Sequence, residues 1–400
     1  MKSRLLLVLV IAALLLSLVA AACTTEEEAE GPIKIGALLG LTGFISSDEH
    51  HVRNGIELAF DEVDYEIAGR EVKLIIEDIG SDTAICLEKV KKLNEMDNVN
   101  LVLGPYLSSH ALAIRDYIHD NELITISHLA ATEKLVTEEA YSDYFFRTAH
   151  CSGYQPAAVA AYIAYYDKGY RKAVAFAPDY VYGWDEVAGF KRVFEGLGGE
   201  VIMETYTPLG NADFGPYMAT IDVENADFIT TCLFAEDSVL FIKALEDYGI
   251  LDKLPVFCHE CCVVEYPQLA AQGDSAIGIE DACHYSPVLD TPENNRFKQA
   301  IWDKFQEEAN FYTESGYTAA KAAILAIEAV DGNIEDTEAM IEALENLEFE
   351  APRGPLRFEL HSPVQNVYHR IVEKVDGKLQ NTVLATYPDI GPLWGPEELQ

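Results

Sequence analysis

Two kinds of hydrophobic pattern alternate along the chain. Short, mostly apolar runs such as 99–103 are typical of strands buried on both faces. Longer stretches such as 111–118 carry apolar residues every three or four positions, which indicates a helix with one buried face. Strands and helices that alternate in this way form parallel sheets with right-handed crossovers. The pattern therefore predicts an α/β protein.

The alternation runs through the chain twice, so we expect two α/β lobes. In the first series the expected strands are 33–39, 72–78, 99–103 and 123–127, and the expected helices are 52–63, 83–96 and 111–118. The pattern restarts after 145–148, with strands expected at 172–177, 201–206, 227–232 and 256–258 and helices at 154–166, 186–194 and 239–248. The chain is expected to close with helices at 297–309, 318–330 and 337–347 and strands at 355–360 and 367–375.

The first residues predict export from the cytoplasm. A basic start precedes the apolar segment 5–19, which is short for a stable membrane span and is typical of a signal peptide. Three alanines then precede Cys23, a junction that resembles the lipobox of bacterial lipoproteins. We expect removal of residues 1–22 and lipid on Cys23, with plain secretion as the alternative. The acidic residues 23–31 hold too little apolar surface to fold and are expected to form a tether.

Charge, length and cysteine content narrow the class of protein. The 400 residues suffice for two domains, and 49% of them are hydrophobic, so sizeable cores are expected. The formal net charge of −39 repels a phosphate backbone, which argues against nucleic acid as a partner. Lipid on Cys23 would leave an odd number of the 8 cysteines, so at least one stays free or pairs outside the chain.

The stretch 104–109 is a candidate anion site. Gly104-Pro105 ends a buried strand, because proline has no N–H to donate to a sheet. Ser108 and Ser109 then stand just before a predicted helix, whose free N–H groups and partial positive charge suit a small carboxylate. The simpler alternative is that one of these serines only caps its own helix.

Several short motifs follow one another along the mature chain. They are Ile33-Lys34-Ile35-Gly36, Leu41-Thr42-Gly43, Asn54-Gly55-Ile56-Glu57-Leu58-Ala59, Gly104-Pro105 with Ser108, Phe146-Arg147-Thr148, Tyr182-Gly183, Asp213-Phe214 and Gly354-Pro355-Leu356. Together they resemble the branched-chain amino-acid-binding proteins of ABC importers. This resemblance implies the type I periplasmic-binding-protein fold, in which two doubly wound parallel-sheet lobes are joined by a three-crossover hinge.

The implied domain organisation divides each lobe between two segments. The first lobe is expected to combine residues 32–148 with 284–360, and the second to combine residues 149–283 with 361–400. The three crossovers are expected near 148–153, 282–287 and 360–365.

The resemblance also implies a ligand site between the lobes, which close on the ligand. Ser108 matches the serine that binds the ligand carboxylate, and Glu260 matches the glutamate that takes an α-ammonium group. The other matching positions are Leu129, Ala131 and Thr132, in a loop whose N–H groups bind the carboxylate, and the aromatic residues Tyr182 and Phe234. The family's first-lobe aromatic is not matched, because polar residues stand at 46–49, so we expect a polar ligand side chain.

The segment 258–262, Cys-His-Glu-Cys-Cys, departs from the family and leaves other functions open. Its thiols and imidazole are soft ligands, which suit a metal or metal-chelate carrier. The spacing matches no common structural zinc pattern, so a disulfide near the hinge or small buried cysteines are the preferred alternatives. The sequence contains no nucleophile-elbow, phosphate-loop or zincin motif, so we expect no catalytic residue, no cofactor and no bound metal.

We therefore expect a monomeric, extracytoplasmic lipoprotein that binds an amino acid or a similar small polar ligand. Its expected partner is the membrane permease of an ABC importer, and its lipid anchor places it on the membrane. A ligand-sensing lipoprotein is a further alternative, and it would require a separate signalling partner.

Overall fold

The computed structural model describes residues 31–137 and 141–395. The predicted signal peptide, Cys23 and residues 24–30 of the predicted tether lie outside this part of the chain. The helices and strands described below belong to one unit, residues 33–400. Within the described residues, no helix combines the length and the apolar content that a bilayer span requires.

The first sheet has six strands in the order β2-β3-β1-β4-β5-β6, and every neighbouring pair except β2–β3 is parallel. Its strands are β1 (Ile33–Leu39), β2 (Glu66–Ile67), β3 (Arg70–Asp78), β4 (Leu101–Leu103), β5 (Thr125–Ser127) and β6 (Phe145–Arg147). Strands β4, β5 and β6 are buried along their whole length. Short apolar runs behave in this way when helices cover both faces of a sheet.

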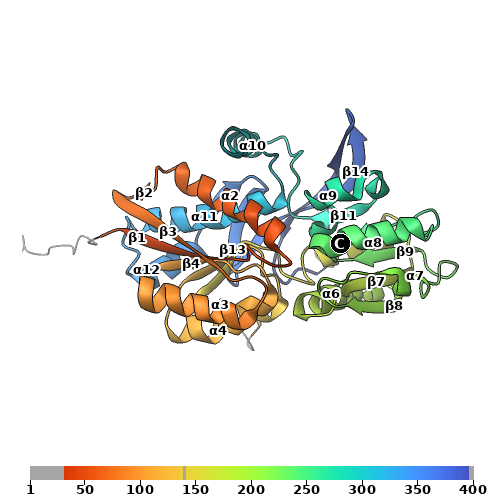
Figure 1. Cartoon of the computed structure of the whole chain (residues 1–400), viewed down its shortest axis with the longest axis horizontal. Helices are drawn as coiled ribbons and strands as arrows, with labels where there is room; N and C mark the ends of the chain where they lie inside the picture. The colour runs from red at the N-terminus through yellow and green to blue at the C-terminus, as the bar shows by residue number, and fades with distance from the viewer. Residues whose placement is uncertain (1–30, 138–140, 396–400) are drawn as a thin grey trace, which may run out of the picture. The chain divides into compact units, whose positions relative to one another are not determined.

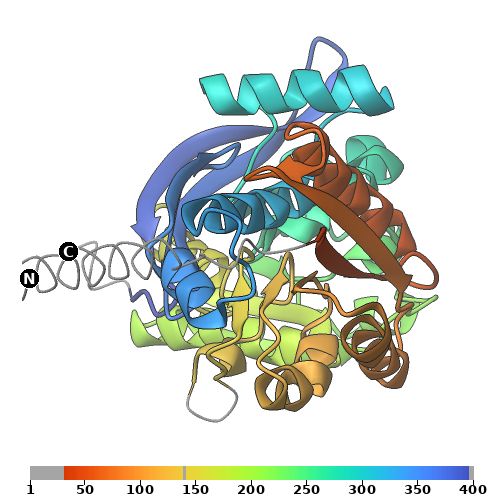
Figure 2. The same ribbon diagram turned by 90° about the vertical axis from the view of Figure 1, so that its left-hand side faces the viewer.

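Helices do cover both faces of this sheet (Figures 1 and 2). One face carries α2 (Ser46–Asp61) and α11 (Phe311–Ala329), and the other carries α3 (Thr83–Lys92) and α4 (Ser108–Asp120). In β4, Leu101 and Leu103 pack in the core with α2 and α11, whereas Val102 packs with α3 and α4. This division follows from the alternation of side chains along a strand. Two further helices, α10 (Pro292–Phe305) and α12 (Thr337–Glu345), contribute to the same core as α2 and α11.

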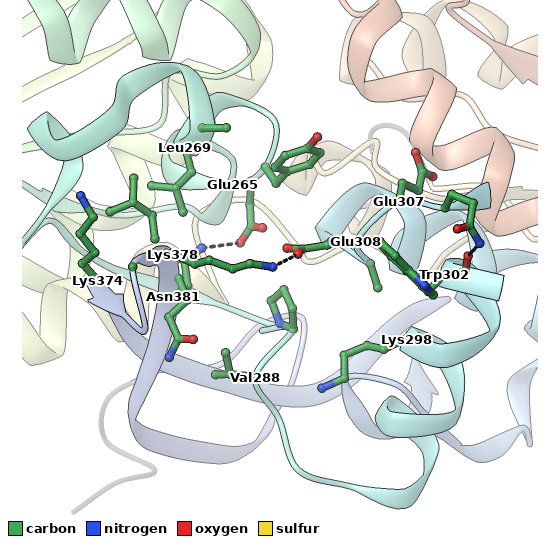
Figure 3. Close-up of a pocket in the computed structure, with 18 of the residues that line it drawn as sticks. Glu265, Leu269, Val288, Lys298, Trp302, Glu307, Glu308, Lys374, Lys378 and Asn381 are labelled. Atoms are coloured by element: carbon green, nitrogen blue, oxygen red, sulfur yellow. Dashed lines mark hydrogen bonds and ion pairs between the residues drawn. The ribbon is translucent and has the colours of Figure 1, made fainter. Parts of the chain in front are cut away.

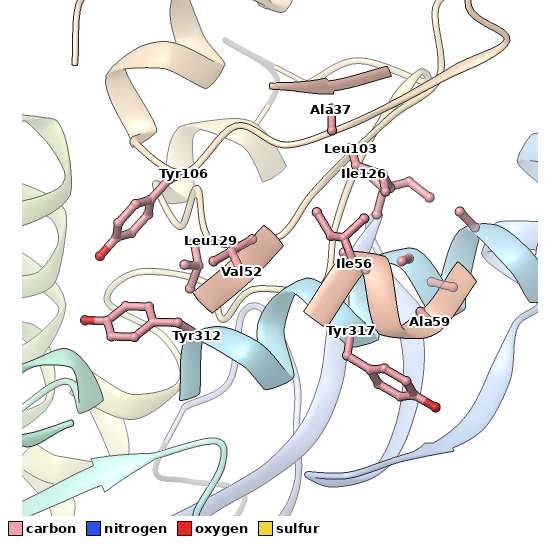
Figure 4. Close-up of a cluster of buried hydrophobic side chains, with 14 of the residues drawn as sticks. Ala37, Val52, Ile56, Ala59, Leu103, Tyr106, Ile126, Leu129, Tyr312 and Tyr317 are labelled. Atoms are coloured by element: carbon pink, nitrogen blue, oxygen red, sulfur yellow. The ribbon is translucent and has the colours of Figure 1, made fainter. Parts of the chain in front are cut away.

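Helices α2 and α11 touch through two glycines. A Cβ on Gly55 would lie 1.9 Å from the carbonyl oxygen of Thr313, and a Cβ on Gly316 would lie 2.1 Å from that of Val52. The two backbones therefore meet at a distance that leaves no space for a side chain. Figure 4 shows the apolar cluster that this contact buries between the helices and the sheet.

The second series of strands begins with a parallel sheet in the order β8-β7-β9. Its strands are β7 (Lys172–Pro178), β8 (Glu200–Thr207) and β9 (Phe228–Thr231). A single bridge between Ile229 and Val256 continues this order toward β10 (Phe257–Cys258), which is parallel to β11 (Glu280–Cys283). The helices of this series are α5 (Pro156–Tyr166), α6 (Val181–Gly196), α7 (Gly215–Met218), α8 (Ala235–Asp247) and α9 (Gln268–Gln272).

The long strand β14 (Ser362–Val375) connects the two series. Its residues 362–365 pair with β13 (Gly354–Glu359), and its residues 368–371 pair with β11, in both cases antiparallel. Two strands that the sequence pattern did not predict, β12 (Glu348–Ala351) and β15 (Lys378–Ile390), complete this sheet. Most residues of β15 are exposed or half-buried. The apolar residues of β15 therefore do not form a buried run of the kind that predicted the other strands.

Candidate ligand-binding site

A small cavity lies where strands of both series end. It is lined by Tyr106, Ser108, Leu129, His150, Tyr180, Tyr182, Phe234 and Cys262, and its volume is about 10 Å³. These residues follow the carboxyl ends of β4, β5, β6, β7, β9 and β10. Ligands of open α/β sheets bind beyond such strand ends, so the cavity marks the candidate site. Its volume has room for about one water molecule, so the lining side chains must separate to admit anything larger.

Ser108 holds the backbone of the neighbouring loop. Its Oγ accepts hydrogen bonds from the N–H groups of Ala131, at 3.3 Å, and Thr132, at 3.1 Å. Leu107 occupies the N-cap position of α4, and no side chain caps this helix. The alternative that Ser108 or Ser109 serves only as a helix cap is therefore wrong. The structure instead places one hydroxyl, two loop N–H groups and the free N–H groups at the start of α4 around one point.

The loop that contains Ala131 and Thr132 is fixed from two directions. The buried Arg147 donates from one guanidinium nitrogen to the carbonyl oxygens of Ala131, at 2.7 Å, and Thr132, at 2.8 Å. The hydroxyl of Thr132 donates to the carboxylate of Asp185 on α6. Since α6 belongs to the second series of elements, this contact joins the two sides of the cleft.

Glu260 lies one contact behind the cavity. Its Oε2 accepts a hydrogen bond from the N–H of Cys262, at 2.9 Å, and from the hydroxyl of Tyr182, at 3.3 Å. Its Oε1 lies 3.6 Å from Nδ1 of His150, whose Nε2 lies 3.2 Å from Oε1 of Glu186. Two buried carboxylates thus flank one imidazole, and two side chains that touch Glu260 line the cavity.

Burial and the neighbouring charges shift the pKa values of Glu186 and His150 in opposite directions. Burial raises the pKa of Glu186 to about 7, although His150 opposes the shift. Burial by itself would lower the pKa of His150, but the charges of Glu260 and Glu186 outweigh it and raise this pKa. The imidazole is therefore held in its charged form to a higher pH than an isolated histidine.

Aromatic rings form the remaining wall, with Phe234 at their centre. Its ring centroid lies 5.4 Å from that of Phe44, 5.9 Å from those of Tyr106 and Tyr182, and 6.3 Å from that of Tyr180. These separations are typical of favourable edge-to-face and tilted ring pairs. Phe44, in the loop before α2, supplies an aromatic from the first series where the sequence analysis found only polar residues at 46–49.

Two of the polar residues at 46–49, Asp48 and Glu49, make polar contacts within the protein. Asp48 accepts a hydrogen bond from Nε2 of Gln268 at 2.7 Å and from the hydroxyl of Tyr106 at 3.4 Å, and burial raises its pKa to about 7. Glu49 lies 2.8 Å from Nε2 of His128. Because Asp48 is on α2 and Gln268 is on α9, their hydrogen bond also crosses the cleft.

The predicted site residues come together, but in two shells. Ser108, Leu129, Tyr182 and Phe234 line the cavity, whereas Ala131, Thr132 and Glu260 contact lining residues. Four lining residues were not predicted from the sequence: Tyr106, His150, Tyr180 and Cys262. The position of two of them carried a usable signal, because Tyr106 and Tyr180 each stand two residues before a predicted site residue.

The cysteine- and histidine-rich segment 258–262 is the candidate metal site, and the structure describes all of its side chains except that of Cys261. The described residues contain no group of three or more His, Cys, Asp and Glu side chains placed to hold a metal ion. Cys258 is buried, and Nδ1 of His259 lies 2.8 Å from the hydroxyl of Thr230. Burial lowers the pKa of His259 to about 3, so its imidazole is neutral. These side chains contribute to packing behind the cleft.

Comparisons with known proteins agree with this geometry. A family model described as "Periplasmic binding protein" matches residues 32–376. A Leu/Ile/Val-binding protein homologue from Brucella suis is 27% identical over 368 residues, which cover 90% of this chain and 92% of the relative.

Two solved structures show the same likeness in three dimensions. An ABC transporter substrate-binding protein from Sphaerobacter thermophilus is 33% identical, with a TM-score of 0.85, and the match covers 90% of this chain and 99% of that one. A solute-binding protein from Rhodopseudomonas palustris HaA2, solved in complex with p-hydroxybenzoic acid, is 29% identical, with a TM-score of 0.84 and coverage of 90% and 98%.

Proposed function

The chain belongs to the periplasmic binding protein family, and from that premise we propose that it binds a small carboxylic acid, with an α-amino acid as the first candidate. It is an extracytoplasmic substrate-binding protein of an ABC transporter, with the type I periplasmic-binding-protein fold. Its family serves transporters and does not consist of enzymes.

The ligand carboxylate is proposed to bind at Ser108. Three kinds of donor converge there: the serine hydroxyl, the N–H groups of Ala131 and Thr132, and the start of α4. An anion in that position gains charge-assisted hydrogen bonds and the favourable end of a helix dipole. The loop is already fixed by Arg147, so binding requires little ordering of its backbone.

The opposite pole is proposed to take the ammonium group. Glu260 and Glu186 place two carboxylates around the single imidazole of His150, and this group meets the cavity through His150 and Tyr182. A ligand cation would be attracted by this buried cluster, in which two carboxylates share one imidazole. This acidic pole, facing the donors around Ser108 across one cavity, is the observation that carries the proposal.

A second candidate is an aromatic acid with a phenolic hydroxyl. The wall around Phe234 is aromatic, and a relative of 29% identity was solved with p-hydroxybenzoic acid. In such a ligand the carboxylate would bind at Ser108, the ring would pack on Phe234, and the hydroxyl would donate toward Glu260. Both candidates place a carboxylate at Ser108. They differ in the group that faces Glu260, which is an ammonium group in an amino acid and a hydroxyl in a phenolic acid.

Calorimetry on Ser108→Ala and Glu260→Gln distinguishes the candidates. A charged hydrogen bond of about 1.5–3 kcal/mol corresponds to roughly tenfold to a hundredfold in affinity. For an amino acid, Glu260→Gln should weaken binding by that factor and by more than Ser108→Ala, which leaves the loop N–H groups in place. For 4-hydroxybenzoate, Glu260→Gln should cost less than for an amino acid, because an amide oxygen still accepts from a phenol.

The controls for this experiment are the amides of the same acids and the thermal stability of each variant. An amide lacks the carboxylate and should bind weakly to every variant. Equal affinity of wild type and both variants for the best ligand would contradict the assignment of both poles.

The proposal extends to how the protein acts at the membrane. Residues 32–148 with 284–360 are proposed to move as one lobe and residues 149–283 with 361–400 as the other, closing on the ligand. Hydrogen bonds from Thr132 to Asp185 and from Gln268 to Asp48 cross the cleft and would form on closure. The closed monomer, held by lipid on Cys23, would then present its ligand to the permease.

A further inference from the structure

We infer that the protein has a second small-molecule site, separate from the cavity at Ser108 and beyond the proposed function, which takes an organic anion with an apolar body. The site is a pocket of about 860 Å³, a volume within the range of small-molecule sites. Lys298 and Trp302 of α10 form one side and Lys378 and Asn381 of β15 the other, as Figure 3 shows. None of its lining residues belongs to the cleft cavity.

Lys298 provides the charge for an anion. In the part of the chain that the structure describes, its ammonium group forms neither an ion pair nor a hydrogen bond. The other two lysines of the pocket are already paired, Lys374 with Asp274 at 2.8 Å and Lys378 with Glu308 at 2.5 Å. An unpaired, half-buried lysine is unexpected in a chain with a net charge of −39, where carboxylates greatly outnumber cations.

Asn381 provides a buried acceptor in the same pocket. Its Nδ2 donates to the carbonyl oxygen of Val264 at 3.0 Å and to Oε1 of Glu265 at 3.3 Å. Its Oδ1 is buried without a hydrogen-bond partner among the described residues, and the residue is only 5% exposed. A ligand N–H or O–H group would supply the partner that this oxygen lacks.

The rest of the lining is suited to an apolar body. Pro287, Val288, Ala309 and Leu379 contribute aliphatic surface. The indole of Trp302 stands at the pocket and is 47% exposed, so a flat ring or an alkyl chain can cover it. An anion on Lys298, a donor on Asn381 and apolar atoms against Trp302 together define the ligand class.

The probe for this site is 8-anilinonaphthalene-1-sulfonate, which carries a sulfonate, an N–H donor and aromatic rings. It is titrated into the purified mature protein while its fluorescence, and energy transfer to it from tryptophan, are recorded. We expect one site per chain. Lys298→Glu should weaken binding at least tenfold, and Trp302→Phe should reduce energy transfer while leaving the stoichiometry unchanged.

The matched control is Lys243→Glu, which makes the same charge change at an exposed lysine of α8 and should alter affinity less than twofold. Competition by octanoate would extend the ligand class to aliphatic carboxylates. Equal losses in the two lysine variants would overturn the inference, because they would show a general effect of charge. Binding that responds to Ser108→Ala and not to Lys298→Glu would overturn it too, since the probe would then occupy the cleft. Thermal unfolding of Lys298→Glu establishes that the variant is folded.

Discussion

Replacing Asp48 by asparagine should stabilise the protein at alkaline pH and leave its stability almost unchanged below pH 3.8. Asp48 is completely buried, and burial raises its pKa from 3.8 to about 7. The groups that act on it are Gln268 and Tyr106, which donate to it, the hydroxyl of Tyr312, which lowers its pKa, and the charges of His51 and Glu49. Hydrogen bonds and His51 favour the charged carboxylate, but burial outweighs them.

The direction in which Asp48 changes stability with pH follows from proton binding. Between pH 3.8 and about 7 the folded protein holds a proton at Asp48 that the unfolded chain releases, so this group makes stability fall as pH rises through that window. Above pH 7 its contribution is constant, and the pKa difference between about 7 and 3.8 sets an upper limit on the order of 4 kcal/mol. Asparagine has no charge to bury, and its oxygen can still accept from Gln268.

Urea unfolding of wild type and Asp48→Asn at pH 5, 6, 7 and 8 measures this effect. The stability difference should be near zero only below pH 3.8; it should already favour the variant by up to about 1.7 kcal/mol at pH 5 and by up to about 4 kcal/mol at pH 8. The other buried acids contribute equally to the unfolding free energies of both proteins, so their contributions cancel in the difference. Asp252→Asn, at an exposed aspartate, is the matched control and should show no such trend. A difference that stays constant with pH would refute the reasoning.

Three further changes test the fold, the anchor and the closing motion. Gly55→Ala should cost about 1–3 kcal/mol in urea unfolding, because its Cβ would meet a carbonyl oxygen at 1.9 Å, whereas Gly196→Ala, with open space around its Cβ, should cost much less. Cys23→Ser should release the protein from the membrane fraction and lower its mature mass by that of the lipid; unchanged fractionation would exclude lipidation. Thr132→Val should weaken ligand binding about tenfold and reduce the ligand-induced compaction seen by small-angle scattering, because Asp185 loses a hydrogen bond across the cleft.

The fold could be predicted from the sequence because strands such as β4 and β7 are buried along almost their whole length. Runs such as 101–103 and 172–178 have few interpretations once helical patterns separate them. The strand β15 escaped prediction for the opposite reason, since its apolar residues are shared between exposed and half-buried positions on one long hairpin with β14. Its place depends on a partner strand, which a local pattern does not reveal.

The site could be predicted less completely. The position of Ser108 before a helix pointed to a cluster of donors, and the structure shows which ones: the N–H groups of Ala131 and Thr132. The pairing of Glu260 with His150 could not be anticipated, because the two residues come from different connections and meet only through tertiary packing. The same holds for Phe44, which reaches Phe234 from the loop before α2.

Both poles of the cleft already have partners within the protein, and this affects which ligand it selects. Ser108 accepts from the loop N–H groups, and Glu260 accepts from Tyr182 and faces His150. A ligand must replace or extend these contacts, so its affinity is the difference between two sets of hydrogen bonds rather than the sum of one. A zwitterion gains at both poles, but its ammonium must enter beside His150, whose charge is favoured by the two glutamates. A hydroxylated acid avoids that repulsion and gains less from Glu260. The preference between amino acids and hydroxy acids should therefore shift toward amino acids wherever a rise in pH removes the proton of His150, and calorimetry with both ligands over a series of pH values up to 8 measures that shift.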